Sequence, residues 1–228
     1  MTVLLSATLS LAPLSLSLAS GGGGMPSGGS MGSMQPIQRT PQDIAKSAYN
    51  SGVRSIKDAK DHEEDAAKAD KDEKKNKYLE KAQKSYSKAL TQFNEAVQQQ
   101  PDMYQAWNYV GFANRHLGHY DEALRAYAKA LELKPDYAEA IEYRGEAYLG
   151  LNQLDAAKDV YMTLFRSARP LSDQLLSAMQ RWVTARRSEA SAVSGTDLDA
   201  FAKWLEDRDQ IAKQTASLAV GAAPPAWR

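Results

Sequence analysis

The stretch AWNYVGFANRHLGHYDEALRAYAKALELKP, from Ala106 to Pro135, decides the fold because much of it recurs downstream. When the sequence is shifted by 34 residues, similar residues coincide: Trp107 with Ile141, Gly111 with Gly145, Ala113 with Ala147, Leu117 with Leu151, Tyr120 with Leu154, Ala123 with Ala157, and Tyr127 with Tyr161. A repeat of this length, with small and large apolar residues at helical spacing, indicates helical hairpins stacked on one another.

The sizes of the repeated residues fit such hairpins. Small residues such as Gly111 fall where two antiparallel helices must approach closely, and large ones such as Tyr127 fill the spaces between hairpins. Gly118 is expected to end the first helix, Asp121 to cap the second, and Pro135 to stop it.

Three motifs within this stretch resemble a known family. WNYVG at residues 107–111, LGHYDEA at 117–123 and YAKA at 127–130, closed by Pro135, together resemble the tetratricopeptide repeat. The resemblance implies an all-α fold in which hairpins stack as a short right-handed solenoid. It places full repeats at residues 102–135 and 136–169.

A weaker repeat precedes them at residues 40–101. Thr40 is expected to be the N-cap of its first helix, with Pro41 at the first helical position. A charged insertion at about residues 58–82 breaks the 34-residue period. Its acids precede its bases by four residues in four pairs: Glu64/Lys68, Asp70/Lys74, Glu73/Lys77 and Glu80/Lys84. We therefore predict a second helix of about 35 residues that projects from the repeats, either as a solvated extension or as a partner-binding spur.

Residues 170–219 contain two further amphipathic segments, which are predicted to be C-terminal capping helices. The first carries an apolar stripe that includes Leu175 and Met179, and the second is expected to start at a Thr196 N-cap. Residues 220–228 are predicted to be a disordered tail.

The N-terminal region combines two segments of different composition. Residues 1–20 are leucine-rich and have the length of a signal peptide, although the usual positive start is missing; residues 21–39 form a Gly/Ser/Met-rich linker. We expect a periplasmic or secreted protein with no stable membrane span after cleavage, and cytoplasmic location is the alternative. A resemblance to small exported bacterial repeat proteins implies the bacterial origin.

Composition argues against several kinds of function. Lysine plus arginine number 28 and aspartate plus glutamate number 28, so the charges cancel and no nucleic-acid partner is predicted. Cysteine is absent, which removes thiolate chemistry and zinc ribbons. The three histidines are His62, at a predicted charged helix start, and His116 and His119, at a turn. We predict no enzyme, no cofactor and no metal site.

The family resemblance also implies where a partner binds. In tetratricopeptide proteins the first helices of the repeats line a concave groove that receives a peptide or helix. By repeat position, the groove residues are Asn108, Tyr109, Phe112, Arg115, Glu139, Glu142, Tyr143 and Glu146. Central aromatics and three glutamates at one end predict a basic, partly apolar protein segment as the partner. The alternative is that these residues are simply solvated.

One known groove chemistry is disfavoured. Repeats that hold the C-terminal carboxylate of heat-shock chaperones use a Lys/Asn/Arg clamp. Here the corresponding residues are Tyr49, Val53, Tyr109, Glu139 and Tyr143. Glu139 would repel a carboxylate, so a co-chaperone of that type is not predicted.

These observations predict a non-enzymatic protein–protein interaction adaptor or scaffold. Three alternatives stay open: a cytoplasmic scaffold of the same fold, a self-associating homo-oligomer, and, remotely, a metal-dependent enzyme that uses His116, His119 and the acidic groove.

Overall fold

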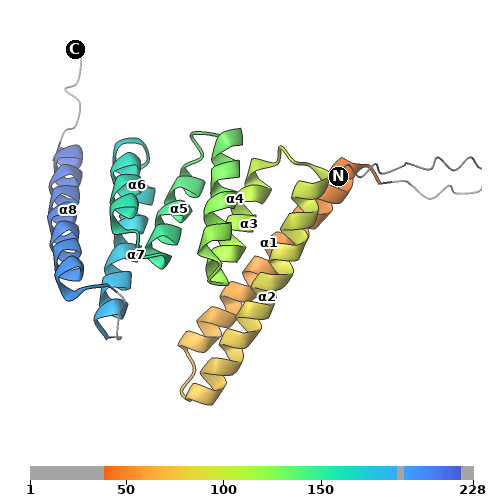
Figure 1. Cartoon of the computed structure of the whole chain (residues 1–228), viewed down its shortest axis with the longest axis horizontal. Helices are drawn as coiled ribbons and strands as arrows, with labels where there is room; N and C mark the ends of the chain where they lie inside the picture. The colour runs from red at the N-terminus through yellow and green to blue at the C-terminus, as the bar shows by residue number, and fades with distance from the viewer. Residues whose placement is uncertain (1–38, 189–192, 222–228) are drawn as a thin grey trace, which may run out of the picture. The chain divides into compact units, whose positions relative to one another are not determined.

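The computed structural model describes residues 39–188 and 193–221, and in this part of the chain it contains only α-helices (Figure 1). They form four successive pairs: α1 (Pro41–Ala67) and α2 (Asp72–Gln99), α3 (Tyr104–His116) and α4 (Tyr120–Leu133), α5 (Ala138–Gly150) and α6 (Leu154–Ser167), α7 (Arg169–Ser188) and α8 (Gly195–Gly221). The all-α prediction is confirmed. The predicted signal peptide, nearly all of the linker and most of the C-terminal tail lie outside the described residues.

Each helix packs against the next one in sequence, and α3, α5 and α7 also contact one another in a row. The repeat explains this order, because glycines let paired helices approach closely. A Cβ atom added at Gly111 of α3 would lie 2.5 Å from the ring of Tyr127 in α4, and one added at Gly52 of α1 would lie 2.6 Å from the ring of Phe93 in α2. Both rings are fully buried.

The turns after α3 and α5 each contain one residue in the left-handed backbone conformation. Gly118, after α3, has a φ of 80°, and Asn152, after α5, has a φ of 58°. After each helix, two backbone N–H groups bond back to the last turn: His119 to Asn114 and Gly118 to Arg115, then Gln153 to Tyr148 and Asn152 to Leu149. Glycine and asparagine tolerate this conformation best, so both turns close in the same way.

The prediction that Asp121 caps α4 is wrong. The helix begins at Tyr120 with His119 in the N-cap position, so Asp121 lies inside the first turn rather than at the cap. An acidic residue there still stabilises the positive end of the helix dipole.

The charged insertion lengthens both helices of the first hairpin. It does not form one helix of about 35 residues, as the sequence led us to predict, because the chain turns between Ala67 and Asp72. Helix α1 therefore has 27 residues and α2 has 28, and both run past α3 and α4 (Figure 1). His62 lies within α1 rather than at a helix start, and its ring stacks on Tyr78 of α2. The start of α1 is as predicted, with Thr40 and Asp43 in a reciprocal capping box.

The last pair of helices, α7 and α8, continues the 34-residue repeat. Leu175 of α7 follows Ile141 of α5 by 34 residues, and α7 packs on α5 as α5 packs on α3. Helix α8 covers α7 with a buried face that includes Phe201 and Leu205. Its cap is Ser194, whose hydroxyl accepts from the Asp197 N–H at 3.2 Å, and not Thr196. No helix in the described ranges is long and apolar enough to cross a membrane.

Candidate functional site

A hollow of about 740 Å³ lies along the odd-numbered helices, and we call it the groove. Helix α1 contributes Lys60, and every other lining residue comes from α3, α5 or α7: Phe112, Arg115, His116, Glu142, Tyr143, Glu146, Pro170, Asp173, Gln174, Ser177 and Arg181. A second hollow of about 430 Å³ shares four of these residues and extends toward Trp182 and Arg186 of α7.

Five of the eight residues predicted from the sequence line this groove: Phe112, Arg115, Glu142, Tyr143 and Glu146. The other three lie elsewhere. Asn108 is buried, Tyr109 stacks on Phe93 with ring centroids 4.8 Å apart, and Glu139 is exposed at the start of α5. The predicted row of three glutamates is thus divided between the groove and solvent.

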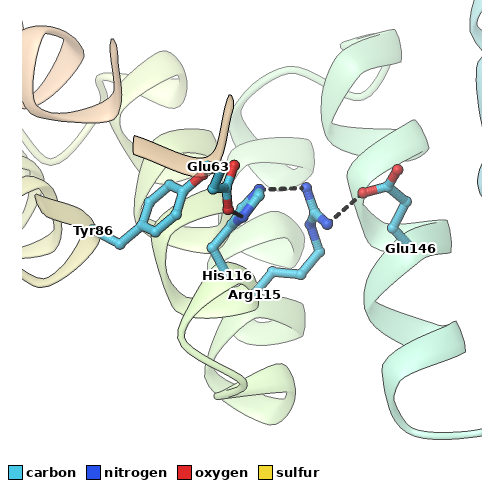
Figure 2. A network of polar contacts seen from close by, with 5 residues as sticks. All are labelled: Glu63, Tyr86, Arg115, His116 and Glu146. Carbon is cyan, nitrogen blue, oxygen red and sulfur yellow. Dashed lines mark hydrogen bonds and ion pairs between the residues drawn. The ribbon is translucent and has the colours of Figure 1, made fainter. Parts of the chain in front are cut away.

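A chain of polar contacts runs beside the groove and links four helices, α1, α2, α3 and α5 (Figure 2). Tyr86 of α2 donates its hydroxyl to Glu63 of α1 at 2.9 Å. The other carboxylate oxygen of Glu63 lies 3.3 Å from Nδ1 of His116, and Nε2 of His116 lies 3.2 Å from Nη2 of Arg115. The guanidinium of Arg115 then pairs with Glu146 of α5.

The neighbours of His116 fix its tautomer. A guanidinium can only donate hydrogen bonds, so Nε2 must accept from Arg115 and the ring proton must be on Nδ1, where it donates to Glu63. Burial lowers the pKa of His116 more than the bond to Glu63 raises it, so the ring is neutral at pH 7. Burial opposes ionisation of Glu63 as well, but bonds from His116 and Tyr86 bring the pKa of Glu63 below its ordinary value.

Aromatic rings and cations form one wall of the groove. The guanidinium of Arg115 lies 5.2 Å from the centre of the Phe112 ring and 5.6 Å from that of Tyr143. The ammonium of Lys60 lies 5.1 Å from the Phe112 ring. These ring faces therefore already attract positive groups.

Glu142 is the least satisfied group of the groove. Its side chain is only 3% exposed, yet it lines the hollow. Among the described residues its carboxyl has no hydrogen bond or ion pair. Burial, and next the negative charge of Glu146, raise the pKa of Glu142 to about 8, against smaller opposing effects of Arg115 and Arg181. The carboxyl is therefore mostly protonated at pH 7.

Sequence reasoning missed Lys60, His116 and the α7 residues of the groove. The α7 residues had a signal, because the 34-residue register continues from Ile141 to Leu175 and makes α7 equivalent to α5. No sequence signal pointed to Lys60 or His116. Lys60 lies in the insertion that breaks the register, and the position of His116 in the sequence indicated a turn residue.

The alternative of a metal-dependent enzyme relied on His116 and His119. Both ring nitrogens of His116 have protein partners, Glu63 and Arg115, and His119 is exposed before α4. The described part of the chain contains no group of three His, Asp or Glu side chains placed to hold a metal ion.

In a comparison with protein families, residues 104–137, from the start of α3 to the residue before α5, match the tetratricopeptide repeat. The matched segment contains four of the groove residues predicted from α3 and one complete helical hairpin. No curated protein matches the chain.

Proposed function

We propose that the chain, whose residues 104–137 match the tetratricopeptide repeat, is a non-enzymatic adaptor that holds a basic, partly apolar segment of a partner protein in the groove. The observation that carries this proposal is the row formed by α3, α5 and α7, which presents aromatic rings and an unsatisfied carboxyl group to one open hollow. A surface of this kind offers both apolar contact area and polar groups that fix the orientation of a bound segment.

The lining of the groove fits a segment of a partner protein. The groove is open and lined by two aromatic rings, Phe112 and Tyr143, together with six Asp, Glu, Lys or Arg side chains, a mixture that suits a peptide. Much of its charge is already paired, since Glu146 is bound to Arg115. Discrimination between partners must therefore come from the groups that are left, which are Glu142, Lys60 and the exposed residues of α7.

A matched pair of α7 variants tests the proposal. Gln174 and Gln180 are both exposed on α7, but only Gln174 lines the groove. The full chain is used to capture partners from cell extract, with Gln174→Arg and Gln180→Arg beside it. We expect the first variant to lose a partner that the parent and the second variant both retain. Equal capture by all three proteins would place the binding surface elsewhere, with the exposed end of the α1–α2 hairpin as the next region to test.

We also propose that the adaptor is exported to the periplasm. This proposal rests on the leucine-rich residues 1–20, which lie outside the described structure. The mass of the protein purified from its native cells tests it: loss of about the first 20 residues supports export, and an intact start contradicts it.

A further inference from the structure

We propose that Glu142 anchors one cationic side chain, a lysine or an arginine, of the segment that enters the groove. The inference rests on the proposed function and goes beyond it by naming the residue that recognises the partner and the chemistry that it recognises.

The first support is the lack of any partner for Glu142. Its side chain is 3% exposed and still borders the hollow, so its free oxygen atoms can be reached only from the groove. A buried carboxyl group without a hydrogen bond is costly, and a ligand that supplies a donor removes that cost. The asparagine 34 residues earlier, Asn108, is also buried with an unpartnered Oδ1 atom, so a polar group is built into the core at this repeat position twice.

The second support comes from the charged groups around Glu142, which are Glu146 on α5, Arg115 and His116 on α3, Asp173 and Arg181 on α7, and Lys60 on α1. Arg115 is bound to Glu146 and His116. Lys60 lies over the Phe112 ring, and Arg181 is exposed on α7. None of these cations forms an ion pair with Glu142, so that carboxyl is left for a group from outside the chain.

The third support concerns the charge of the ligand, which we infer to be positive. Phe112 and Tyr143 present ring faces that already bind cations, and they border the same hollow as Glu142. Glu146 adds negative charge close to Glu142, which is why it raises the pKa of that group. An incoming cation is attracted by the charge of Glu146 and by the ring faces, and it favours ionisation of Glu142, whereas these groups offer no attraction to an incoming anion. Because Glu142 is mostly protonated when the groove is empty, binding of the cation releases a proton.

The experiment follows the titration of Glu142 in the full chain by carboxyl ¹³C nuclear magnetic resonance. Three tripeptides serve as probes: acetyl-Leu-Arg-Leu-amide, the same peptide with neutral citrulline in place of arginine, and the same peptide with glutamate. The Glu142 signal is identified by its loss in Glu142→Gln, which resembles the protonated side chain in shape and charge.

We expect the arginine peptide to lower the titration midpoint of Glu142 by about one pH unit or more, and the citrulline peptide to leave it unchanged. The matched control is Glu139→Gln, on the same helix but outside the groove, which should respond as the parent does. An unchanged midpoint with the arginine peptide, an equal shift with citrulline, or a rise with the glutamate peptide alone overturns the proposal.

A second variant tests whether Arg181 of α7 competes with the peptide in the groove. Arg181→Ala removes a competing cation from the groove, so it should tighten binding of the arginine peptide; weaker binding would overturn the assignment of a cationic ligand. The two experiments distinguish failure of this proposal from failure of the proposed function. If Gln174→Arg abolishes partner capture and the arginine peptide has no effect on Glu142, the adaptor proposal is supported and the role of Glu142 as an anchor is contradicted.

Discussion

Arg115 of α3 and Glu146 of α5 form an ion pair that joins two successive repeats. Their side chains are only 16% and 19% exposed, so solvent screens the pair weakly. The same guanidinium also donates to His116, which in turn holds Glu63 of α1. One arginine thereby connects the first three hairpins along the wall of the groove (Figure 2), and the shape of that wall depends on it.

Arg115→Met should destabilise the fold. The substitution leaves Glu146 partly buried, unpaired and next to Glu142, and losing one partner of a buried pair typically costs about 3 to 5 kcal/mol. Unfolding in urea measures the loss. Arg125→Met is the control, because Arg125 pairs with Glu122 at an exposed site and should be nearly neutral. Equal effects of the two substitutions would contradict the structural role of Arg115.

Gly111→Ala should also destabilise the fold, for a steric reason. The added methyl group would lie 2.5 Å from the buried ring of Tyr127, and overpacking of this kind costs about 1 to 3 kcal/mol. Gly195→Ala is the matched control, since nothing lies within 4 Å of the added atom. Thermal unfolding should show a lower midpoint for the first variant alone.

Glu142 should make the stability of the parent depend on pH. In the unfolded chain its pKa is about 4.3, and in the folded protein burial and Glu146 raise the pKa to about 8. Between these values the unfolded chain has lost the proton and the folded protein keeps it, so the free energy of unfolding falls as pH rises. Relative to Glu142→Gln, the parent should lose up to about 1.4 kcal/mol per pH unit across this window.

Urea unfolding at a series of pH values checks this expectation. Below about pH 4 the group is protonated in both states, so the difference between parent and variant should be constant there. A difference that stays constant up to pH 8 would mean that Glu142 is ionised in the fold and has a partner that stabilises its charge.

Ser194→Ala should weaken the start of α8, while Thr196→Ala should not. The hydroxyl of Ser194 accepts from the Asp197 N–H, and loss of an N-cap bond costs about 1 kcal/mol. Hydrogen exchange of the first-turn amides of α8 distinguishes the two variants. Faster exchange in Thr196→Ala alone would show that Thr196, and not Ser194, is the N-cap of α8.

The repeat register made most of the fold predictable. Tyr127 and Tyr161 were expected to be buried between hairpins, and both are fully buried. Tyr127 instead packs on Gly111 inside the α3–α4 hairpin. The helix starts were less predictable. Asp121 and Thr196 are each the right kind of residue one or two positions from the true start, since capping preferences are local and the helix boundary is set by how its apolar face meets its neighbours.

The candidate site was also only partly predictable from the sequence. Phe112 and Tyr143 were predicted as groove residues because the family resemblance assigns their repeat positions to the groove, and both line it. The sequence could not reveal that Glu142 is buried and protonated, nor that Glu146 is already paired, because a pKa depends on distances between groups on different helices.

The sequence by itself therefore determined the helical class and the repeat. The first depends on residues a few positions apart, and the second on similar residues 34 positions apart. Only the tertiary structure decided how the charged insertion is shared between α1 and α2, and that α7 and Lys60 complete the groove. It also decided which carboxyl group of the groove has no partner. These features depend on contacts between residues far apart in the chain, and burial and charge pairing arise only once the helices are packed.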